Sequence, residues 1–294
     1  MPFPFLQLLF NSLIIGSVYA LVAVGFSLIY STNRFMHFAH GASVVIAGYS
    51  LFSFFTILGI PFALSSLLTL LLSAVVGYGM FKFVYQPLQN KKSSTVILLI
   101  ASIAILILVE NLVLLFYGAG VRSIGLLETA KGIAVGSANI TPLQIILILI
   151  SMILLLSLYL FLNKTKLGRD LRAVADNKEL AAIMGLNTEK LLAISFIIGS
   201  ALAGIAGILI GLEQNLDPTM GTSLMVKGFS GAVIGGIYSV LGSVLGSYIV
   251  GLVENFGSWY LPSGFKDAIT FTLLFLFLLF RPVGLLGIEK GVKG

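Results

Sequence analysis

Residues 5–30 read FLQLLFNSLIIGSVYALVAVGFSLIY and contain no Asp, Glu, Lys or Arg. A transmembrane α-helix needs about 20 consecutive, mostly apolar residues to cross the hydrocarbon core of a bilayer. This run is longer than that. It is also longer than the apolar part of a secretory signal peptide, and no basic residue precedes it. We therefore predict that these residues form a retained first membrane span.

The composition of the whole chain extends this interpretation. Of 294 residues, 58% are hydrophobic and 10% are charged, and the mean hydropathy is +1.09. Because a typical soluble domain has about 25% charged residues, this chain has too little charge to cover a soluble surface. The apolar residues supply about eight spans of roughly 20 residues each. That leaves no room for a catalytic domain of ordinary size, so we expect no enzymatic activity.

The net charge of +6 has a simple explanation in a membrane protein. Basic residues collect in cytoplasmic loops, so the charge does not call for nucleic acid as a partner. The chain has no cysteine and two histidines. We therefore expect no disulfide, no thiol chemistry, no metal site and no cofactor.

Apolar runs separated by turn residues and charges predict an all-α polytopic membrane protein with eight to nine transmembrane segments. The expected spans are about 5–31, 41–58, 62–84, 95–117, 142–162, 191–212 and 267–280, with a glycine-broken apolar stretch at 224–257. Residues 1–294 then form a single transmembrane domain, and residues 163–190 are its one strongly charged loop.

Charge also predicts the orientation of the chain. The 163–190 loop holds six Lys and Arg residues, which is typical of a cytoplasmic loop. Counting spans back from this loop puts the N-terminus outside, and the basic C-terminal tail should lie in the cytoplasm. Residues 224–257 must then contain two short segments, or one crossing and a re-entrant piece. The turn between them would fall near residues 237–242.

A weak similarity links the two halves of the chain. Ile14-Ile15-Gly16-Ser17 with Ala20 recurs as Ile197-Ile198-Gly199-Ser200 with Ala203, and Met36 and Tyr49 roughly parallel Met225 and Tyr238. The copies begin five spans apart, so they would face opposite ways. Inverted repeats are typical of transporters, with the substrate path at the repeat interface. The plan would be four spans, one linking span and four more, although small residues also recur in unrelated helices.

The 163–190 loop contains the start and stop signals of a short helix. Asp176-Asn177-Lys178-Glu179 is expected to be an N-cap with an acidic residue at the third helical position, and Gly185 is a natural stop. Between them, Leu180, Ile183 and Met184 form an apolar face. We predict an amphipathic cytoplasmic helix over about 177–184. It would either lie on the lipid surface or dock into a groove of a soluble partner.

Polar residues at membrane depth are few, and each is a candidate for the transport path. Glycines at four-residue spacing either pack helices closely or mark a broken helix that lines a path. His37 and His40 are expected as hydrogen-bonding residues at the inner interface. The candidate pathway residues are His40, Glu110, Asn111, Lys227, Gly235, Gly236 and Glu254. Since the chain has no G-x-x-x-x-G-K-[ST], H-E-x-x-H or G-x-S-x-G motif, a phosphate-binding loop for ATP is absent.

Several motifs resemble the branched-chain amino acid ABC transporter permeases of the LivH type. They are Phe38-Ala39-His40-Gly41, the stretch from Gly168-Arg169 to Gly185-Leu186-Asn187, Pro218 with Met220-Gly221, Lys227-Gly228-Phe229, and Gly251-Leu252-Val253-Glu254. The match extends over nearly the whole chain. His37 departs from the family pattern, which usually has Asn at this position.

The resemblance implies one half of a heterodimeric permease in the bacterial inner membrane. Its partners would be a second, LivM-like permease subunit, two cytoplasmic ATPase subunits and a periplasmic amino-acid-binding protein. The 177–184 helix would be the coupling helix that seats in an ATPase groove. The coupling residues would be Arg172, Ala173, Asn177, Ala181, Ala182, Ile183, Met184 and Gly185. The implied substrate is an apolar amino acid such as leucine. An ion-coupled secondary transporter of small amino acids or amides is the alternative, because of the possible inverted repeat.

Overall fold

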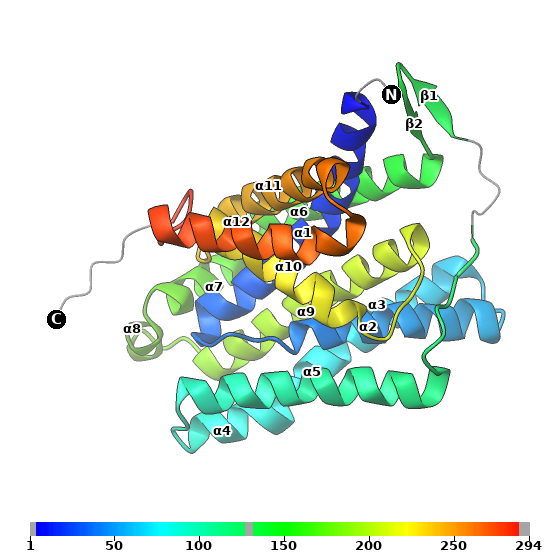
Figure 1. Ribbon diagram of the computed structural model, residues 1–294. Helices are drawn as coiled ribbons and strands as arrows, with labels where there is room; N and C mark the ends of the chain where they lie inside the picture. The colour runs from blue at the N-terminus through cyan, green and yellow to red at the C-terminus, as the bar shows by residue number, and fades with distance from the viewer. Residues whose placement is uncertain (1–3, 127–131, 288–294) are drawn as a thin grey trace.

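The computed structural model describes residues 4–126 and 132–287, and these form a bundle of helices with one small β-hairpin (Figure 1). The helices are α1 (Phe5–Asn33), α2 (His40–Leu51), α3 (Phe62–Gly79), α4 (Gln86–Asn90), α5 (Thr95–Tyr117), α6 (Pro142–Lys164), α7 (Lys166–Asp176), α8 (Lys178–Ile183), α9 (Thr188–Glu213), α10 (Met220–Gly235), α11 (Val240–Tyr260) and α12 (Lys266–Phe280). The shorter elements are the π-helical η1 (Phe52–Ile57) and η2 (Met80–Tyr85), the 3₁₀ turn η3 (Ser263–Phe265), and the strands β1 (Ile133–Val135) and β2 (Ala138–Ile140).

Seven helical runs in the described residues are long and apolar enough to cross a membrane. They are Phe5–Asn33, His40–Ile57, Phe62–Asn90, Thr95–Tyr117, Pro142–Lys164, Thr188–Glu213 and Val240–Tyr260. The remaining two apolar helices, α10 with 16 residues and α12 with 15 residues, are shorter than the ~30 Å hydrocarbon core at 1.5 Å per residue. All nine expected apolar segments are therefore helices.

The glycine-broken stretch divides as expected into two helices, with a turn at residues 236–239. Only α10 is short, however, because α11 has 21 residues and is long enough to span. The second short helix is α12. Gly235 explains the close approach of α10 to α11, since a Cβ atom on it would lie 1.8 Å from the Gly242 carbonyl oxygen. The packing interpretation of these glycines is thus confirmed at this contact.

Side-chain caps start several helices where the sequence places Ser or Thr. The hydroxyl of Ser94 accepts a hydrogen bond from the Ile97 N–H at the start of α5. Thr141 and Gln144 form a reciprocal capping box at the start of α6. Such caps satisfy backbone N–H groups that have no partner within the helix. The hairpin pairs β1 and β2 antiparallel just before α6, in the segment expected to be a loop.

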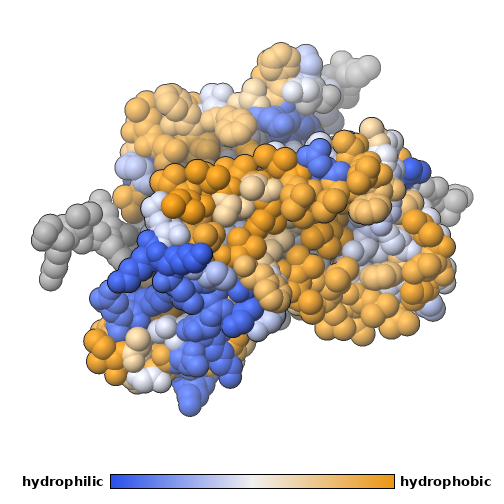
Figure 2. Space-filling view, turned by 90° about the horizontal axis from the view of Figure 1, so that it is seen from below, coloured by the Kyte–Doolittle hydropathy of each residue, from blue (hydrophilic) through white to orange (hydrophobic). Residues whose placement is uncertain are grey.

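Helices α1 and α9 occupy the middle of the bundle (Figure 1). Helix α1 packs against α9, α10 and α11, while α9 packs against α1, α2 and α3. Outer helices such as α5, α6 and α12 expose Leu, Ile and Phe side chains. Figure 2 shows a largely hydrophobic face with hydrophilic residues gathered toward one end. This distribution fits a protein whose sides contact lipid.

Two helices begin inside the protein. After α1 the chain is non-helical from 34 to 39, and after α9 it is non-helical from 214 to 219. The starts of α2 and α10 meet at Gly41 and Gly221. A Cβ atom on Gly41 would lie 2.5 Å from the Gly221 carbonyl oxygen, and one on Gly221 would lie 2.7 Å from that of Gly41. Only glycine permits backbones to approach this closely.

Candidate functional site

The charged 163–190 loop folds into two consecutive helices, α7 and α8. Asn177 lies between them, and its side-chain oxygen accepts a hydrogen bond from the Leu180 N–H at 2.9 Å. Gly185 follows α8 with φ +84°, a left-handed conformation that favours glycine. The short helix predicted over 177–184 is therefore confirmed, with Lys178–Ile183 as its helical residues. It lies with α4 at the end of the bundle opposite the β-hairpin (Figure 1).

Helix α7 was not predicted, although its signals are present in the sequence. The Thr165 hydroxyl accepts a hydrogen bond from the Gly168 N–H at 3.0 Å and caps the helix. Gly168, Leu171 and Val174 are buried at three-residue spacing, which is the pattern of an amphipathic helix. The many charged residues of the loop conceal this periodicity. Arg172 and Ala173, two of the predicted coupling residues, lie on α7.

The apolar face of α8 is exposed. Ile183 is 82% and Met184 is 75% exposed, and Leu180 is also exposed. Ala181, by contrast, is buried against the rest of the protein. Partial desolvation lowers the pKa of the Lys178 ammonium at the start of the helix. The tip of α8 therefore presents a small apolar surface, surrounded by charged loop residues, that nothing within the described chain covers.

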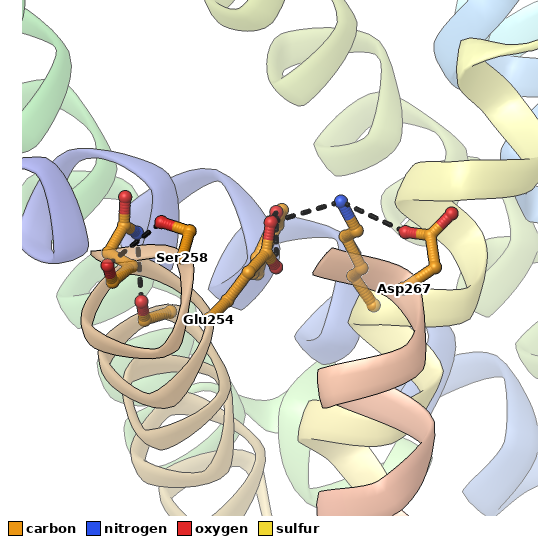
Figure 3. Close-up of polar contacts among 7 residues, drawn as sticks. Glu254, Ser258 and Asp267 are labelled. Carbon is orange, nitrogen blue, oxygen red and sulfur yellow. Dashed lines mark hydrogen bonds and ion pairs between the residues drawn. The ribbon is translucent and has the colours of Figure 1, made fainter. Parts of the chain in front are cut away.

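A second concentration of charge is buried between α1, α10, α11 and α12. The Lys227 ammonium lies 3.2 Å from a carboxylate oxygen of Glu254 and 3.3 Å from one of Asp267 (Figure 3). The Tyr19 hydroxyl donates to Glu254 at 3.0 Å. We call these four residues the Lys227 network. Lys227 and Glu254 are buried, whereas Asp267 is half or more exposed at the start of α12.

The network brings together two of the predicted pathway residues and adds two that sequence reasoning missed. Its one ammonium and two carboxylates satisfy one another by short, charge-assisted contacts. Such pairing is required, because an unpaired charge in a low-dielectric interior is very costly. Asp267 begins the last span, where an acidic residue is common, so its position gave no sign of a distant partner. Tyr19 lies in an apolar run, and nothing in the surrounding sequence indicates that it would contact a buried carboxylate.

Glu110 has a different role from the one expected of an isolated intramembrane carboxylate. Its Oε1 accepts hydrogen bonds from the Thr222 N–H and the Thr222 hydroxyl, both at 2.8 Å. It thereby caps α10, where a negative charge is favoured by the helix dipole. Asn111 is exposed and donates to the Ile107 carbonyl. Both line a pocket of about 280 Å³ that also includes Asp217 and Thr219.

His37 and His40, which were expected to form hydrogen bonds at the inner interface, are both fully buried within the protein. The non-helical segment before α2 carries them into the protein. His37 Nδ1 lies 2.9 Å from the Tyr85 hydroxyl, and the two imidazole rings are 6.1 Å apart. His40 begins α2 and lies against Gly25 of α1. It is therefore near the meeting point of α2 and α10.

Gly235 and Gly236 end α10 at the turn into α11. Gly236 has φ +109°, and the Gly235 carbonyl accepts a hydrogen bond from the Leu286 N–H. Their observed role is close packing and a turn. Within residues 4–126 and 132–287, no three His, Asp or Glu side chains gather as a possible metal site. The predicted pathway residues thus belong to one ionic network, two helix starts and one turn, except Asn111, which is exposed on α5.

Comparison with known proteins gives a consistent result. Residues 8–280 match a family model described as branched-chain amino acid transport system / permease component. The high-affinity branched-chain amino acid transport permease LivH of Escherichia coli K12 is 34% identical, covering 96% of both chains. BraD of Pseudomonas aeruginosa, with the same description, is 32% identical, again covering 96% of both. A chain of PsaBC from Streptococcus pneumoniae in complex with Fab has the same fold, with a TM-score of 0.52, 14% identity, and coverage of 92% and 91%.

Proposed function

The chain belongs to the family of branched-chain amino acid transport permease components, and from this we propose that it is a permease subunit of an ATP-binding cassette importer. It forms part of the path for an apolar amino acid and couples that path to separate ATPase subunits. It is a multi-pass membrane protein, and its proposed location is the bacterial inner membrane. Residues 1–294 act as one transmembrane permease domain, with 163–190 as the coupling loop.

The observation that carries this proposal is the exposed apolar tip of α8. Burying a side chain such as Ile183 is worth about 1.5–3 kcal/mol, so an uncovered Ile183–Met184 pair at the end of a basic loop favours a protein partner. An amphipathic helix in a groove is a common recognition mode. We assign ATPase contact to Arg172, Ala173, Asn177, Ala182, Ile183, Met184 and Gly185, and we assign Ala181, which is buried, to holding α8 against the rest of the protein.

The proposed assembly contains four kinds of chain. A second permease subunit completes the path, two ATPase subunits bind in the cytoplasm, and a periplasmic binding protein delivers the amino acid. The N-terminus lies outside and the C-terminus inside. This orientation puts the 236–239 turn in the cytoplasm, so a cysteine at Ser239 should react with an impermeant reagent only from that side. Labelling from the periplasm would contradict the proposed topology.

The packing pattern supports an inverted repeat of four spans, a linking span and four spans. In it, α1, α2, α3 and α5 correspond to α9, α10, α11 and α12, and α6 is the link. Helix α1 packs against α10 and α11 as α9 packs against α2 and α3. The starts His40-Gly41-Ala42-Ser43 and Met220-Gly221-Thr222-Ser223 meet each other. This pairing gives a different register from the one Met36 and Met225 suggested.

We place the path beside these two broken helices, because irregular backbone is tolerated at membrane depth where it lines a cavity or is buried in protein. His40 and Glu110 lie at the two helix starts. Lys227, farther along α10, pairs with Glu254 in the second half of α11. In the proposed orientation the outer end of this region includes Asn111, and its inner end includes Gly235 and Gly236. The apolar surroundings suit an apolar amino acid such as leucine, isoleucine or valine.

Reconstitution in liposomes tests the function. With the second permease, the ATPase subunits and the binding protein present, radiolabelled leucine should accumulate only when ATP is supplied to the ATPase side. An ATPase variant lacking its phosphate-loop lysine is the matched control and should give no uptake. Uptake by the chain with no ATPase present would contradict the proposal. The inverted repeat also fits an ion-coupled secondary transporter, and uptake that an uncoupler abolishes while ATP is maintained would favour it.

A further inference from the structure

Arg34 lies where α1 ends and the non-helical segment leading to α2 begins. Its backbone adopts the left-handed conformation, with φ 60° and ψ 28°, and its N–H bonds to the Tyr30 carbonyl at 2.8 Å. Only a few per cent of residues other than glycine have positive φ. This conformation turns the chain sharply out of α1 at the same end of the bundle as α7.

The guanidinium group makes one contact with the proposed coupling loop. Its Nη2 donates a hydrogen bond to the carbonyl oxygen of Ala175, in the last turn of α7. Cations are favoured at this end of a helix, where carbonyl groups have no partner within the helix. Ala175 precedes Asn177, the N-cap of α8, by two residues. Any displacement of α8 therefore reaches this hydrogen bond through a very short length of chain.

The same guanidinium makes a second contact, with the turn between α10 and α11. Its central carbon lies 4.8 Å from the centre of the Tyr238 ring, within the range of a cation–π interaction. Tyr238 belongs to the turn between α10 and α11, and the Tyr30 ring lies 5.5 Å from it. The Ser27 hydroxyl donates to the Ile237 carbonyl at 2.6 Å. Helix α1 and this turn are thus joined directly.

An open pocket lies between the elements that Arg34 joins. It has a volume of about 400 Å³ and is lined by residues of α1, α6, α7 and the α10–α11 turn, among them Ser31, Leu171, Arg172, Tyr238 and Ser239. Side chains therefore do not fill the space between α7 and the α10–α11 turn, and Arg34 contacts both elements.

We propose that Arg34 is a positioning residue that transmits movement of the coupling loop to the two broken helices. One end of the link is α7, next to the surface assigned to the ATPase. The other end is the α10–α11 turn, and the Arg34 backbone itself begins the segment that leads into α2. The inference rests on the proposed ATPase coupling. To that proposal the inference adds a specific route, which runs from α8 through α7 and Arg34 to the start of α2 and to the end of α10.

The test uses the complete reconstituted transporter. Arg34→Met keeps most of the side-chain length but removes the guanidinium. We expect the ATPase subunits to co-purify normally, and ATP hydrolysis to remain responsive to the loaded binding protein. Leucine uptake per ATP hydrolysed should fall about tenfold. In Arg34→Lys, which keeps the charge but not the planar group, leucine uptake per ATP hydrolysed should fall less. Arg281→Met is the matched control, because it removes an exposed arginine that lies outside the coupling loop, and it should leave the ratio unchanged.

A double-mutant comparison separates positioning from a general loss of stability. Tyr238→Leu should also lower uptake per ATP, and Arg34→Met combined with Tyr238→Leu should cost little more than either change alone. An unchanged uptake-to-hydrolysis ratio in Arg34→Met would overturn the inference. So would a parallel loss of assembly, hydrolysis and uptake, which indicates a structural role. If the unaltered chain binds no ATPase, the proposed function itself fails.

Discussion

The α7–α8 loop and the Lys227 network hold the chain's two main concentrations of charge, and they arrange charge in opposite ways. In the loop the charged residues are exposed, and so are the apolar Ile183 and Met184. In the network Lys227 and Glu254 are buried, and each contacts an oppositely charged group within 3.2 Å. The loop leaves apolar surface uncovered, whereas the network leaves no charged member without a partner.

This difference separates a surface that we propose binds another protein from a cluster that is complete within one chain. An exposed apolar tip has little effect on the stability of the isolated subunit, because its side chains remain in contact with water until a partner covers them. A buried ionic cluster behaves differently, because removing one member leaves the others desolvated and unpaired. Substitutions in the loop should therefore affect assembly, and substitutions in the network should affect the fold.

The largest expected effect is that of Lys227→Met. The change leaves Glu254 buried beside Tyr19 without its cation, and removing one partner from a buried ion pair typically costs about 3–5 kcal/mol. We expect the free energy of unfolding in detergent to fall by about that amount. It can be measured by denaturant titration of the purified subunit, followed by circular dichroism.

A second substitution shows whether the loss comes from the unpaired carboxylate. Glu254→Gln removes the charge that Lys227 would have paired, and glutamine can still accept the Tyr19 hydrogen bond. Lys227→Met with Glu254→Gln should therefore be more stable than Lys227→Met alone. If the double variant is the less stable of the two, the network is not held together by charge pairing.

Next in size is the effect of Ile183→Asp on assembly. The side chain is 82% exposed, so the stability of the subunit should not change. Losing the burial of an isoleucine, about 1.5–3 kcal/mol, should weaken ATPase binding by roughly 10- to 100-fold. Titration of labelled ATPase against the reconstituted chain measures this. Ile183→Leu, which keeps the apolar surface, is the control. Normal ATPase affinity in Ile183→Asp would remove the loop from the interface.

The two regions also differ in how far the sequence predicted them. The loop's short helix follows from local signals, Asn177 before it and Gly185 after it, which act within one turn of the chain. The Lys227 network depends on contacts between residues far apart in sequence, such as Tyr19 with Glu254. No local pattern marks such pairs. The nine apolar segments were predictable for the same local reason, because length and hydropathy alone define a span.

What the sequence did not reveal is where helices break inside the protein. His37 and His40 follow Arg34, and a basic residue beside histidines is a normal sign of a membrane surface. The segment instead turns inward and starts α2 against the start of α10. That contact requires both Gly41 and Gly221, and neither glycine alone differs from the many that merely pack helices. What distinguishes these two glycines is the contact between them, which joins residues far apart in the sequence, and not the local sequence around either one.

The smallest expected effect tests whether the α8 surface is formed before a partner arrives. Helix α8 has six residues, too few to be stable alone in water, and the Asn177 side chain holds its first turn. Asn177→Ala should cost the helix about 1 kcal/mol and lower ATPase affinity roughly fivefold. Asn187→Ala is a matched control, since Asn187 caps the 26-residue α9 in the same way, and a buried helix of that length should tolerate it. Equal affinities for Asn177→Ala and the unaltered chain would mean that the ATPase itself induces the helix. The loop would then differ from the network in a second way, because its structure would form only when the partner binds.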